Sequence, residues 1–367
     1  MNRLVLLAAG GTGGHLFPAE ALAHALIARG MTVDLATDDR ARSYGADFPA
    51  RTIHAIAAAT PRGGGVAARL GAAATLARGF MQALAVVRRT RPAVVVGFGG
   101  YPTAPPVLAA SVLGVPTLLH EQNAVMGKAN RFLSGRATRI ATGFPLVHAS
   151  AEILAKAVVT GNPLRPAVLK AAEWPYPESA DGRLRVLVTG GSQGARVMAD
   201  IVPGAIAALS PQERARIALV QQARGEDEAR VKAAFAALGF SADVQPFFKD
   251  LPCRIADAHL VISRSGASTV SEIAAIGRPA ILVPFPFALD ADQAANAAEL
   301  ARTGAAAVVT QNDFTVDRLA ALLREALARP DVLAARAQAA KSAGAPDAAE
   351  RLADETLKLA TAKDWNA

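Results

Sequence analysis

Short apolar runs alternate along the chain with longer, alanine-rich stretches of helical character. Strands that are apolar throughout are typical of parallel sheets that helices cover on both faces. The pattern therefore predicts an α/β fold in which strands and helices alternate. The predicted strands include residues 4–8, 33–36, 94–96, 117–119, 185–188, 218–220, 260–262 and 280–283.

The pattern begins twice. An apolar run leads into a glycine-rich turn at residues 10–14, and a second run leads into a similar turn at residues 190–194. Two such strand–turn–helix starts predict two doubly wound, Rossmann-like domains facing across a cleft. We place the first domain at residues 1–162 and the second at residues 163–344. A final amphipathic helix at about residues 345–367 is expected to pack back on the first domain.

One uncharged stretch, residues 93–119, is long enough to span a bilayer. Proline and glycine interrupt it too often for a single helix. We predict a strand, a glycine loop, a short helix and a second strand there, and no membrane-spanning helix in the chain.

Composition narrows the class of protein. Hydrophobic residues make up 52% and charged residues 19%, which excludes a disordered chain, and the single Cys253 excludes a disulfide scaffold. The net charge of +8 lies wholly in the first half, where residues 1–160 hold 16 Lys and Arg against 7 Asp and Glu. No acidic residue occurs between Phe48 and His120. This asymmetry indicates that one domain has an anionic partner.

Glycine-rich turns between a strand and a helix present free N–H groups and the positive end of the helix dipole, which together bind phosphate. Three such loops, at residues 10–14, 97–101 and 190–194, are more specific than one, although each could serve only close strand–helix packing. The dinucleotide fingerprint fails, because its third glycine in the first loop would fall at Leu16 and the loop at residues 190–194 has no Gly-x-Gly. A dehydrogenase is therefore disfavoured.

Six motifs occur in order along the chain: Gly10-Gly11-Thr12-Gly13-Gly14-His15, Gly99-Gly100-Tyr101-Pro102, His120-Glu121-Gln122-Asn123, Gly161-Asn162-Pro163-x-Arg165, Gly190-Gly191-Ser192-Gln193-Gly194-Ala195-Arg196 and residues 264–272. Together they resemble the MurG family of peptidoglycan glycosyltransferases, from residue 3 to about residue 300. The resemblance implies the twin-Rossmann (GT-B) fold. It also implies inverting transfer of N-acetylglucosamine from UDP-N-acetylglucosamine to the 4-hydroxyl of N-acetylmuramic acid in undecaprenyl-linked lipid I, without a cofactor.

The same resemblance implies a nucleotide site in the second domain. Glu272 would bind the ribose hydroxyls, and the backbone at Phe248 would read the uracil edge. The diphosphate would lie against Ser192, Arg165 and the helix start formed by Ala267, Ser268, Thr269, Val270 and Ser271. The donor sugar would touch Asn123 and Gln293, and the donor would also contact Thr12, Gly13 and Gly14.

A metal ion is not expected. Asp290-Ala291-Asp292 matches the Asp-x-Asp site of other glycosyltransferases, but it leads into Gln293, which the resemblance assigns to the sugar. A helix N-terminus and Arg165 would stabilise the leaving diphosphate instead.

Two residues are candidates for the general base. His15 ends the first glycine loop and imidazole titrates near neutrality, whereas Glu121 is a rival carboxylate at the end of another predicted strand. Gly99, Gly100, Tyr101 and His120 would lie on the acceptor side. The alternatives are that His15 only packs against its loop, and that His120 and Glu121 form an interior pair.

A lipid acceptor explains the basic first domain. Residues 66–87 combine apolar side chains with Arg69 and Arg78, which would suit an anionic membrane surface, although an ordinary core-facing helix has the same pattern. We expect a peripheral enzyme on the cytoplasmic face of the bacterial inner membrane, with no nucleic-acid partner. A GT-B enzyme with another acceptor and a non-catalytic sugar-nucleotide-binding protein are the rival functions.

Overall fold

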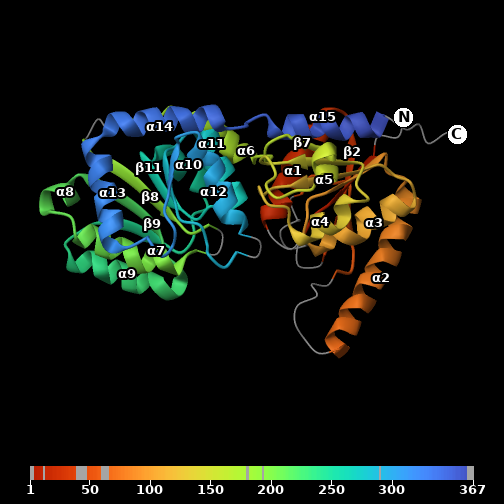
Figure 1. The fold of residues 1–367 in the computed structure, drawn as a ribbon, viewed down its shortest axis with the longest axis horizontal. Helices are drawn as coiled ribbons and strands as arrows, with labels where there is room; N and C mark the ends of the chain where they lie inside the picture. The colour runs from red at the N-terminus through yellow and green to blue at the C-terminus, as the bar shows by residue number, and fades with distance from the viewer. Residues whose placement is uncertain are drawn as a thin grey trace. The chain divides into compact units, whose positions relative to one another are not determined.

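The computed structural model describes residues 4–10, 13–38, 48–58, 66–178, 182–191, 194–288 and 291–361, with the backbone alone at 66–70 (Figure 1). The chain divides into two compact units. Unit 1 comprises Met1–Arg165 and Asp347–Ala367, and unit 2 comprises Pro166–Pro346.

Unit 1 contains a parallel sheet of seven strands in the order β3-β2-β1-β4-β5-β6-β7. Leu7 in the central strand β1 pairs with Leu35 on one side and with Val96 on the other. The strands are β1 (Leu4–Ala8), β2 (Thr32–Thr37), β3 (Thr52–Ala55), β4 (Val94–Gly97), β5 (Thr117–Glu121), β6 (Arg139–Thr142) and β7 (Ala157–Val159).

Helices cover both faces of this sheet. The helices of unit 1 are α1 (Gly13–Ala28), α2 (Val66–Thr90), the 3-10 turn η2 (Tyr101–Thr103), α3 (Ala104–Val112), α4 (Lys128–Ser134), α5 (Ala151–Lys156) and α15 (Ala348–Thr361). Helices α1 and α15 share one apolar core with the sheet, and α2, α3 and α4 share the other. Arg29, in the turn directly after α1, forms ion pairs with Glu350 and Asp354 of α15, so the C-terminal helix packs on unit 1.

Unit 2 repeats the design with a six-stranded parallel sheet in the order β10-β9-β8-β11-β12-β13. Its strands are β8 (Leu184–Thr189), β9 (Ile217–Gln222), β10 (Ala242–Gln245), β11 (Leu260–Ser263), β12 (Ala280–Leu282) and β13 (Ala306–Val308). Its helices are α6 (Pro166–Ala172), α7 (Arg196–Ala207), α8 (Pro211–Ala215), α9 (Gly225–Ala237), α10 (Leu251–Asp257), α11 (Ala267–Ile276), α12 (Asp292–Arg302), α13 (Val316–Ala328) and α14 (Pro330–Ala343).

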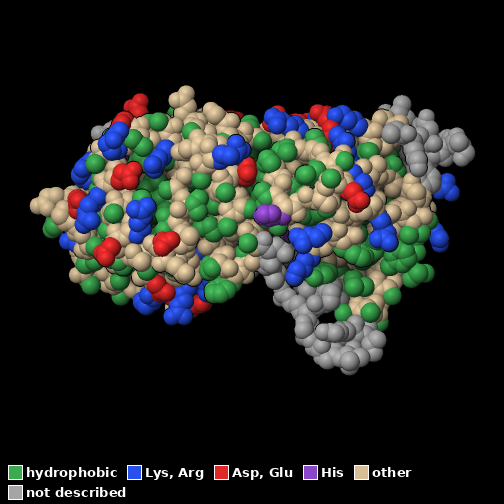
Figure 2. Space-filling model, in the orientation of Figure 1, with side chains coloured by type: hydrophobic (Ala, Val, Ile, Leu, Met, Phe, Trp, Pro, Cys, Tyr) green, Lys and Arg blue, Asp and Glu red, His purple; other side chains and the backbone are tan. Residues whose placement is uncertain are grey.

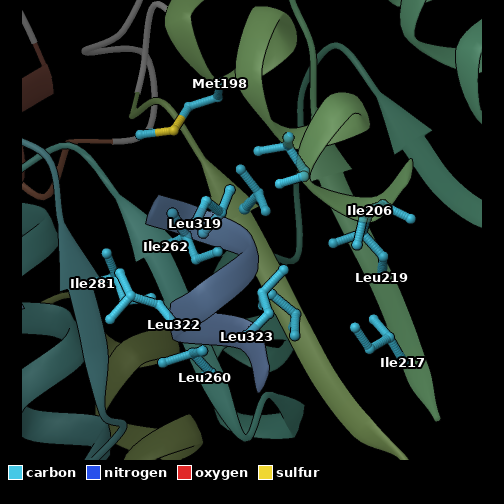
Figure 3. Packing of buried hydrophobic residues seen from close by; sticks show 14 of the residues in the cluster. Met198, Ile206, Ile217, Leu219, Leu260, Ile262, Ile281, Leu319, Leu322 and Leu323 are labelled. Atoms are coloured by element: carbon cyan, nitrogen blue, oxygen red, sulfur yellow. The ribbon is translucent and has the colours of Figure 1, made fainter. Parts of the chain in front are cut away.

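Aliphatic side chains fill the core of unit 2. In Figure 3, Leu319, Leu322 and Leu323 of α13 lie over the strand residues Ile262 and Ile281. Helices α7 and α9 contribute to the same core, while α6, α10 and α11 pack against one another. Acidic and basic side chains are interspersed over the outer surface of unit 2, as expected from its nearly balanced charge (Figure 2).

The two doubly wound domains expected from the sequence are confirmed. Residues 93–119 also form the predicted strand, glycine loop, short helix and strand, as β4, η2, α3 and β5. In the described ranges, none of the helices combines the length and the apolar character that a membrane span requires.

Strand order places the loops that carry chemistry. In unit 1 the chain turns back on itself between β1 and β4, and in unit 2 between β8 and β11. Ligands of doubly wound sheets bind at such a switch point, beyond the carboxyl ends of the strands. The three glycine loops predicted from the sequence follow β1, β4 and β8, so they lie at these two places.

Candidate active site

In unit 1 the glycine loops after β1 and β4 pack against each other. A Cβ atom on Gly10 would lie 3.0 Å from Cγ of Pro102, and Gly99 and Gly100 have φ values of 87° and 73°. The Thr103 hydroxyl donates to the carbonyls of Ala8 (2.9 Å) and Gly99 (2.7 Å). Glycine is favoured at Gly99 and Gly100 because φ is positive there, and at Gly10 because the Pro102 and Asp38 side chains lie close.

His15 lies against this pair of loops. It is the third residue of α1 and is half-buried. A Cβ atom on Gly99 or Gly100 would lie 3.4–3.5 Å from its ring, so the imidazole covers the backbone of the second loop. Burial lowers the pKa of His15, and a hydrogen bond with the Gly10 carbonyl offsets part of that effect. The ring is therefore neutral near pH 7 and can accept a proton.

His120 lies beneath the surface in β5 and is fully buried. Its Nε2 is 3.2 Å from the Gly161 carbonyl, and the Gln122 side chain approaches Nδ1 at 3.0 Å. Burial lowers the pKa of His120 to about 4. A neutral ring with N–H at Nε2, donating to Gly161 and accepting at Nδ1, satisfies both contacts. His120 therefore organises the carboxyl end of β5 from inside.

Glu121 closes β5 and is 2% exposed. Its carboxylate accepts the backbone N–H groups of Asn123 (3.1 Å) and Gly127 (3.0 Å) and the side-chain amide of Asn130 (2.9 Å). Burial raises the pKa of Glu121, while these donors act in the opposite direction. The carboxylate thus holds the 122–127 loop in place, and both of its oxygens are engaged.

Four other described residues of unit 1 besides Arg165 were expected at the site from the sequence: Asn123, Tyr101, Gly13 and Gly14. Asn123 is half-buried and its side-chain amide lies 3.4 Å from Glu121. The guanidinium of Arg165 lies over the ring of Phe17, 4.4 Å from its centroid. Tyr101 is half-buried at the start of η2. Gly13 and Gly14 begin α1, and Thr12 is outside the described residues.

The corresponding loop of unit 2 follows β8. A Cβ atom on Gly190 would lie 2.1 Å from the backbone nitrogen of Ala195, so only glycine is accommodated there. The Gln222 side-chain carbonyl accepts from the N–H of Gly190 (3.0 Å) and the hydroxyl of Thr189 (2.9 Å). Its amide donates to the Pro246 carbonyl (3.2 Å), which ties the loops after β8 and β10 together. Ser192 is outside the described residues.

Helix α11 begins at the same edge of unit 2. Its N-cap residue is Gly266, which has no side chain that could accept a hydrogen bond. The N–H groups of residues 267–269 in the first turn therefore receive no side-chain cap from it. Val270 and Ser271 continue the helix, and Glu272 is buried in its second turn. The Gln293 side chain of α12 accepts from the Phe285 N–H (3.0 Å), and its carbonyl accepts the Ser265 hydroxyl (2.8 Å). Glu272, Gln293 and residues 267–269 thus share one edge of unit 2.

Phe248 follows β10 on this edge. Its ring is buried, and the Arg254 guanidinium lies 4.3 Å from the ring centroid. This packing fixes the backbone of the 246–250 segment, which is the part expected to read a uracil edge.

Several residues that order the site carried no assigned role in the sequence. Gln222 acts through a hydrogen bond from Gly190, 32 residues away in the chain, and Asn130 donates to the Glu121 carboxylate at the end of β5. Arg264 is buried rather than on the surface, and it donates to the carbonyls of Val283 (3.0 Å) and Pro284 (3.1 Å). Their positions in the sequence could have indicated a role in the site. Gln222 ends a strand and Arg264 follows one, and residues at the carboxyl ends of parallel strands lie where ligands bind.

Over the described part of the chain, no three His, Cys, Asp or Glu side chains gather closely enough to hold a metal ion. Asp292 is the first residue of α12, and its carboxylate accepts the N–H of Gln293 (2.9 Å). Asp290 is outside the described residues.

Two doubly wound units with glycine loops at their switch points define a two-domain α/β protein of the kind that binds ligands beyond the carboxyl ends of its strands. The chain belongs to glycosyltransferase family 28. The family's N-terminal domain matches residues 5–142, and its C-terminal domain matches residues 185–352.

Curated relatives share most of the sequence. A protein of Methylobacterium radiotolerans is 59% identical over 359 residues, covering 97% of each chain, and one of Methylobacterium nodulans is 60% identical over 361 residues, again with 97% of each. Both are named UDP-N-acetylglucosamine--N-acetylmuramyl-(pentapeptide) pyrophosphoryl-undecaprenol N-acetylglucosamine transferase. The crystal structure of Acinetobacter baumannii MurG is similar with a TM-score of 0.80 and 31% identity, covering 97% of this chain and 99% of that one.

Proposed function

We propose that this protein transfers N-acetylglucosamine from UDP-N-acetylglucosamine to undecaprenyl-pyrophosphoryl-N-acetylmuramyl-pentapeptide (lipid I), which yields lipid II for peptidoglycan synthesis. The observation that carries the proposal is the 59–60% identity to relatives so named, which extends over 97% of each chain and so includes both units. The family model and the similarity to a MurG crystal structure support it independently.

The nucleotide sugar is assigned to unit 2, with residues 163–344 as its domain. The N-terminus of α11 offers backbone N–H groups for a diphosphate, and the glycine loop after β8 lies at the same edge of the sheet. Glu272 is assigned to the ribose, the backbone at Phe248 to the uracil, and Gln293 with Asn123 to the sugar. Arg165 and Ser192 complete the diphosphate contacts in this assignment.

Residues 1–162 are assigned to the acceptor, and His15 is the base. In a single displacement, the 4-hydroxyl oxygen of N-acetylmuramic acid bonds to the anomeric carbon while the bond from that carbon to UDP breaks. His15 takes the hydroxyl proton, for which its lowered pKa keeps it neutral. Glu121 is the weaker candidate, because its oxygens already accept from the 122–127 loop and from Asn130. No metal ion takes part in this scheme.

Binding to an anionic membrane surface is assigned to unit 1, at the cytoplasmic face of the inner membrane. The charge excess of residues 1–160 supports it, as do Met81, 63% exposed on α2, and the exposed Arg78 and Arg88 of the same helix. The apolar face is narrower than the sequence suggested, because Leu84 belongs to the unit 1 core. Salt should weaken binding to anionic vesicles, since it screens exposed charges.

One assay separates the candidate functions: UDP release from UDP-N-acetylglucosamine with and without a soluble lipid I analogue. The proposal requires release that depends on the analogue and a disaccharide product detected by mass spectrometry. Turnover with a different acceptor only would identify another glycosyltransferase of this fold. Tight UDP binding without turnover on any acceptor would identify a sugar-nucleotide-binding protein.

A further inference from the structure

Arg224 lies at the ligand edge of unit 2, between two loops of the proposed nucleotide site. It follows β9 and directly precedes α9, and β9 is flanked by β8 and β10. The glycine loop at 190–194 follows β8, and the segment that contains Phe248 follows β10. A Cβ atom on Gly194 would lie 2.9 Å from Cγ of Arg224, so the arginine stem packs directly on the glycine loop.

The guanidinium of Arg224 is poorly satisfied. Its Nε atom is buried and has no hydrogen-bond partner among the described residues. Its ion pair with Glu226 is long, at 3.5 Å, and the Glu226 side chain is 73% exposed. An ion pair of that length and exposure contributes little, whereas a buried N–H group without an acceptor is costly. The arginine is therefore placed for an acceptor that the described residues do not supply.

A second arginine adds positive charge nearby. Burial and then the charge of Arg224 lower the pKa of Arg264. Three N–H groups of Arg264 are used, on the carbonyls of Val283 and Pro284 and on the side chain of Gln311. Arg224 has fewer internal hydrogen bonds among the described residues, so it has the greater hydrogen-bonding capacity for an anion.

We propose that Arg224 binds the diphosphate of the nucleotide donor at the ligand edge of unit 2. The inference rests on the proposed function and names a further donor-binding residue for it. A planar guanidinium suits this role because it can donate two parallel hydrogen bonds to phosphate oxygens. The charge also balances the developing negative charge on UDP as the bond to the sugar breaks.

The test compares ligands that differ only in phosphate. Calorimetry measures the affinity of the full-length protein for UDP and for uridine, with Arg224→Gln, Arg224→Lys and the control Arg318→Gln. Arg318 is an exposed arginine of unit 2 on α13, so its variant removes the same charge from the same unit.

Arg224→Gln should weaken UDP binding about tenfold to a hundredfold and leave uridine binding unchanged, because only the phosphate contacts are lost. Arg224→Lys should recover part of the UDP affinity, and Arg318→Gln should bind as the wild type does. Wild-type UDP affinity in Arg224→Gln would overturn the inference, and so would equal losses for UDP and uridine, which indicate a structural role. If the wild-type protein itself fails to bind UDP, the proposed function fails and the inference falls with it.

Discussion

Acid should destabilise unit 1 through His120. The imidazole is fully buried, its Nε2 faces the Gly161 carbonyl and its Nδ1 faces the Gln122 amide. Protonation would place a second N–H against that amide and a charge in an apolar interior. Burial accordingly holds the pKa of His120 at about 4, against 6.5 in the unfolded chain.

The direction of the pH effect on stability depends on whether the folded or the unfolded state binds the proton. Between pH 6.5 and about 4 the unfolded chain binds a proton that the folded protein does not, so unfolding becomes easier as pH falls. The contribution of His120 to the free energy of unfolding is fully present above pH 6.5 and is lost progressively down to about pH 4. At pH 5 the loss is about 2 kcal/mol, from 1.36 kcal/mol per pH unit between the two pKa values.

Urea unfolding at pH 7.5 and pH 5 measures this loss, with hydrogen exchange of peptides from β4 and β5 to identify the transition of unit 1. The matched variant is His120→Gln, whose amide can still donate to Gly161 but does not titrate. At pH 7.5 the wild type should be the more stable protein. At pH 5 its advantage over the variant should shrink by about 2 kcal/mol. An advantage that is the same at both pH values would refute the assignment of a neutral, buried imidazole.

Four further outcomes are expected. His15→Ala should lower the turnover rate about 10²–10⁴-fold with UDP affinity unchanged, and stopped assays across pH should show that the acidic limb of the profile, below 6.5 in the wild type, is gone. Gly190→Ala should weaken UDP binding because its Cβ would collide with the loop backbone, whereas Gly225→Ala, with open space around it, should bind normally in the same titration. Arg278→Met should lower the free energy of unfolding by about 3 kcal/mol or more in chemical denaturation, since the buried guanidinium donates to carbonyls of residues 175, 256, 276 and 277. Activity should persist in excess EDTA, and loss of activity that magnesium or manganese restores would instead assign a metal to Asp292.

The central strands were predictable because each is buried on both faces and therefore mostly apolar. Strands β1, β4, β8 and β11 are of this kind, and their polar exceptions are Arg185, Thr189 and Ser263. The edge strands outside the predicted set, β3, β7, β10 and β13, are short and partly exposed. Strands β3 and β10 contain polar residues, and β7 and β13 are apolar but only three residues long. Their pairing depends on the neighbouring strand rather than on their own composition.

The sequence predicted which loops form the candidate site, but it did not predict the role of each residue in them. Glycine at positions 99 and 190 follows from positive φ and from close backbone approach, which are local requirements visible in the sequence. The sequence alone could not favour either His15 or Glu121 as the general base. That choice depends on Gly127 and Asn130, which approach the Glu121 carboxylate only after the loop and α4 have folded.

The sequence by itself determined two parallel-sheet domains, because apolar runs and glycine turns act on their own neighbours in the chain. Only the tertiary structure decided which polar groups form hydrogen bonds inside the protein and which can still form them with a ligand at the carboxyl edge of the sheet. Arg224 and Arg264 look alike as arginines beside strand ends, yet Arg264 meets Gln311 from a distant loop while Arg224 packs on Gly194 with a buried N–H unpaired among the described residues. The physical reason is that a hydrogen bond satisfies a buried group only when its partner arrives in space, and these partners are far apart in sequence.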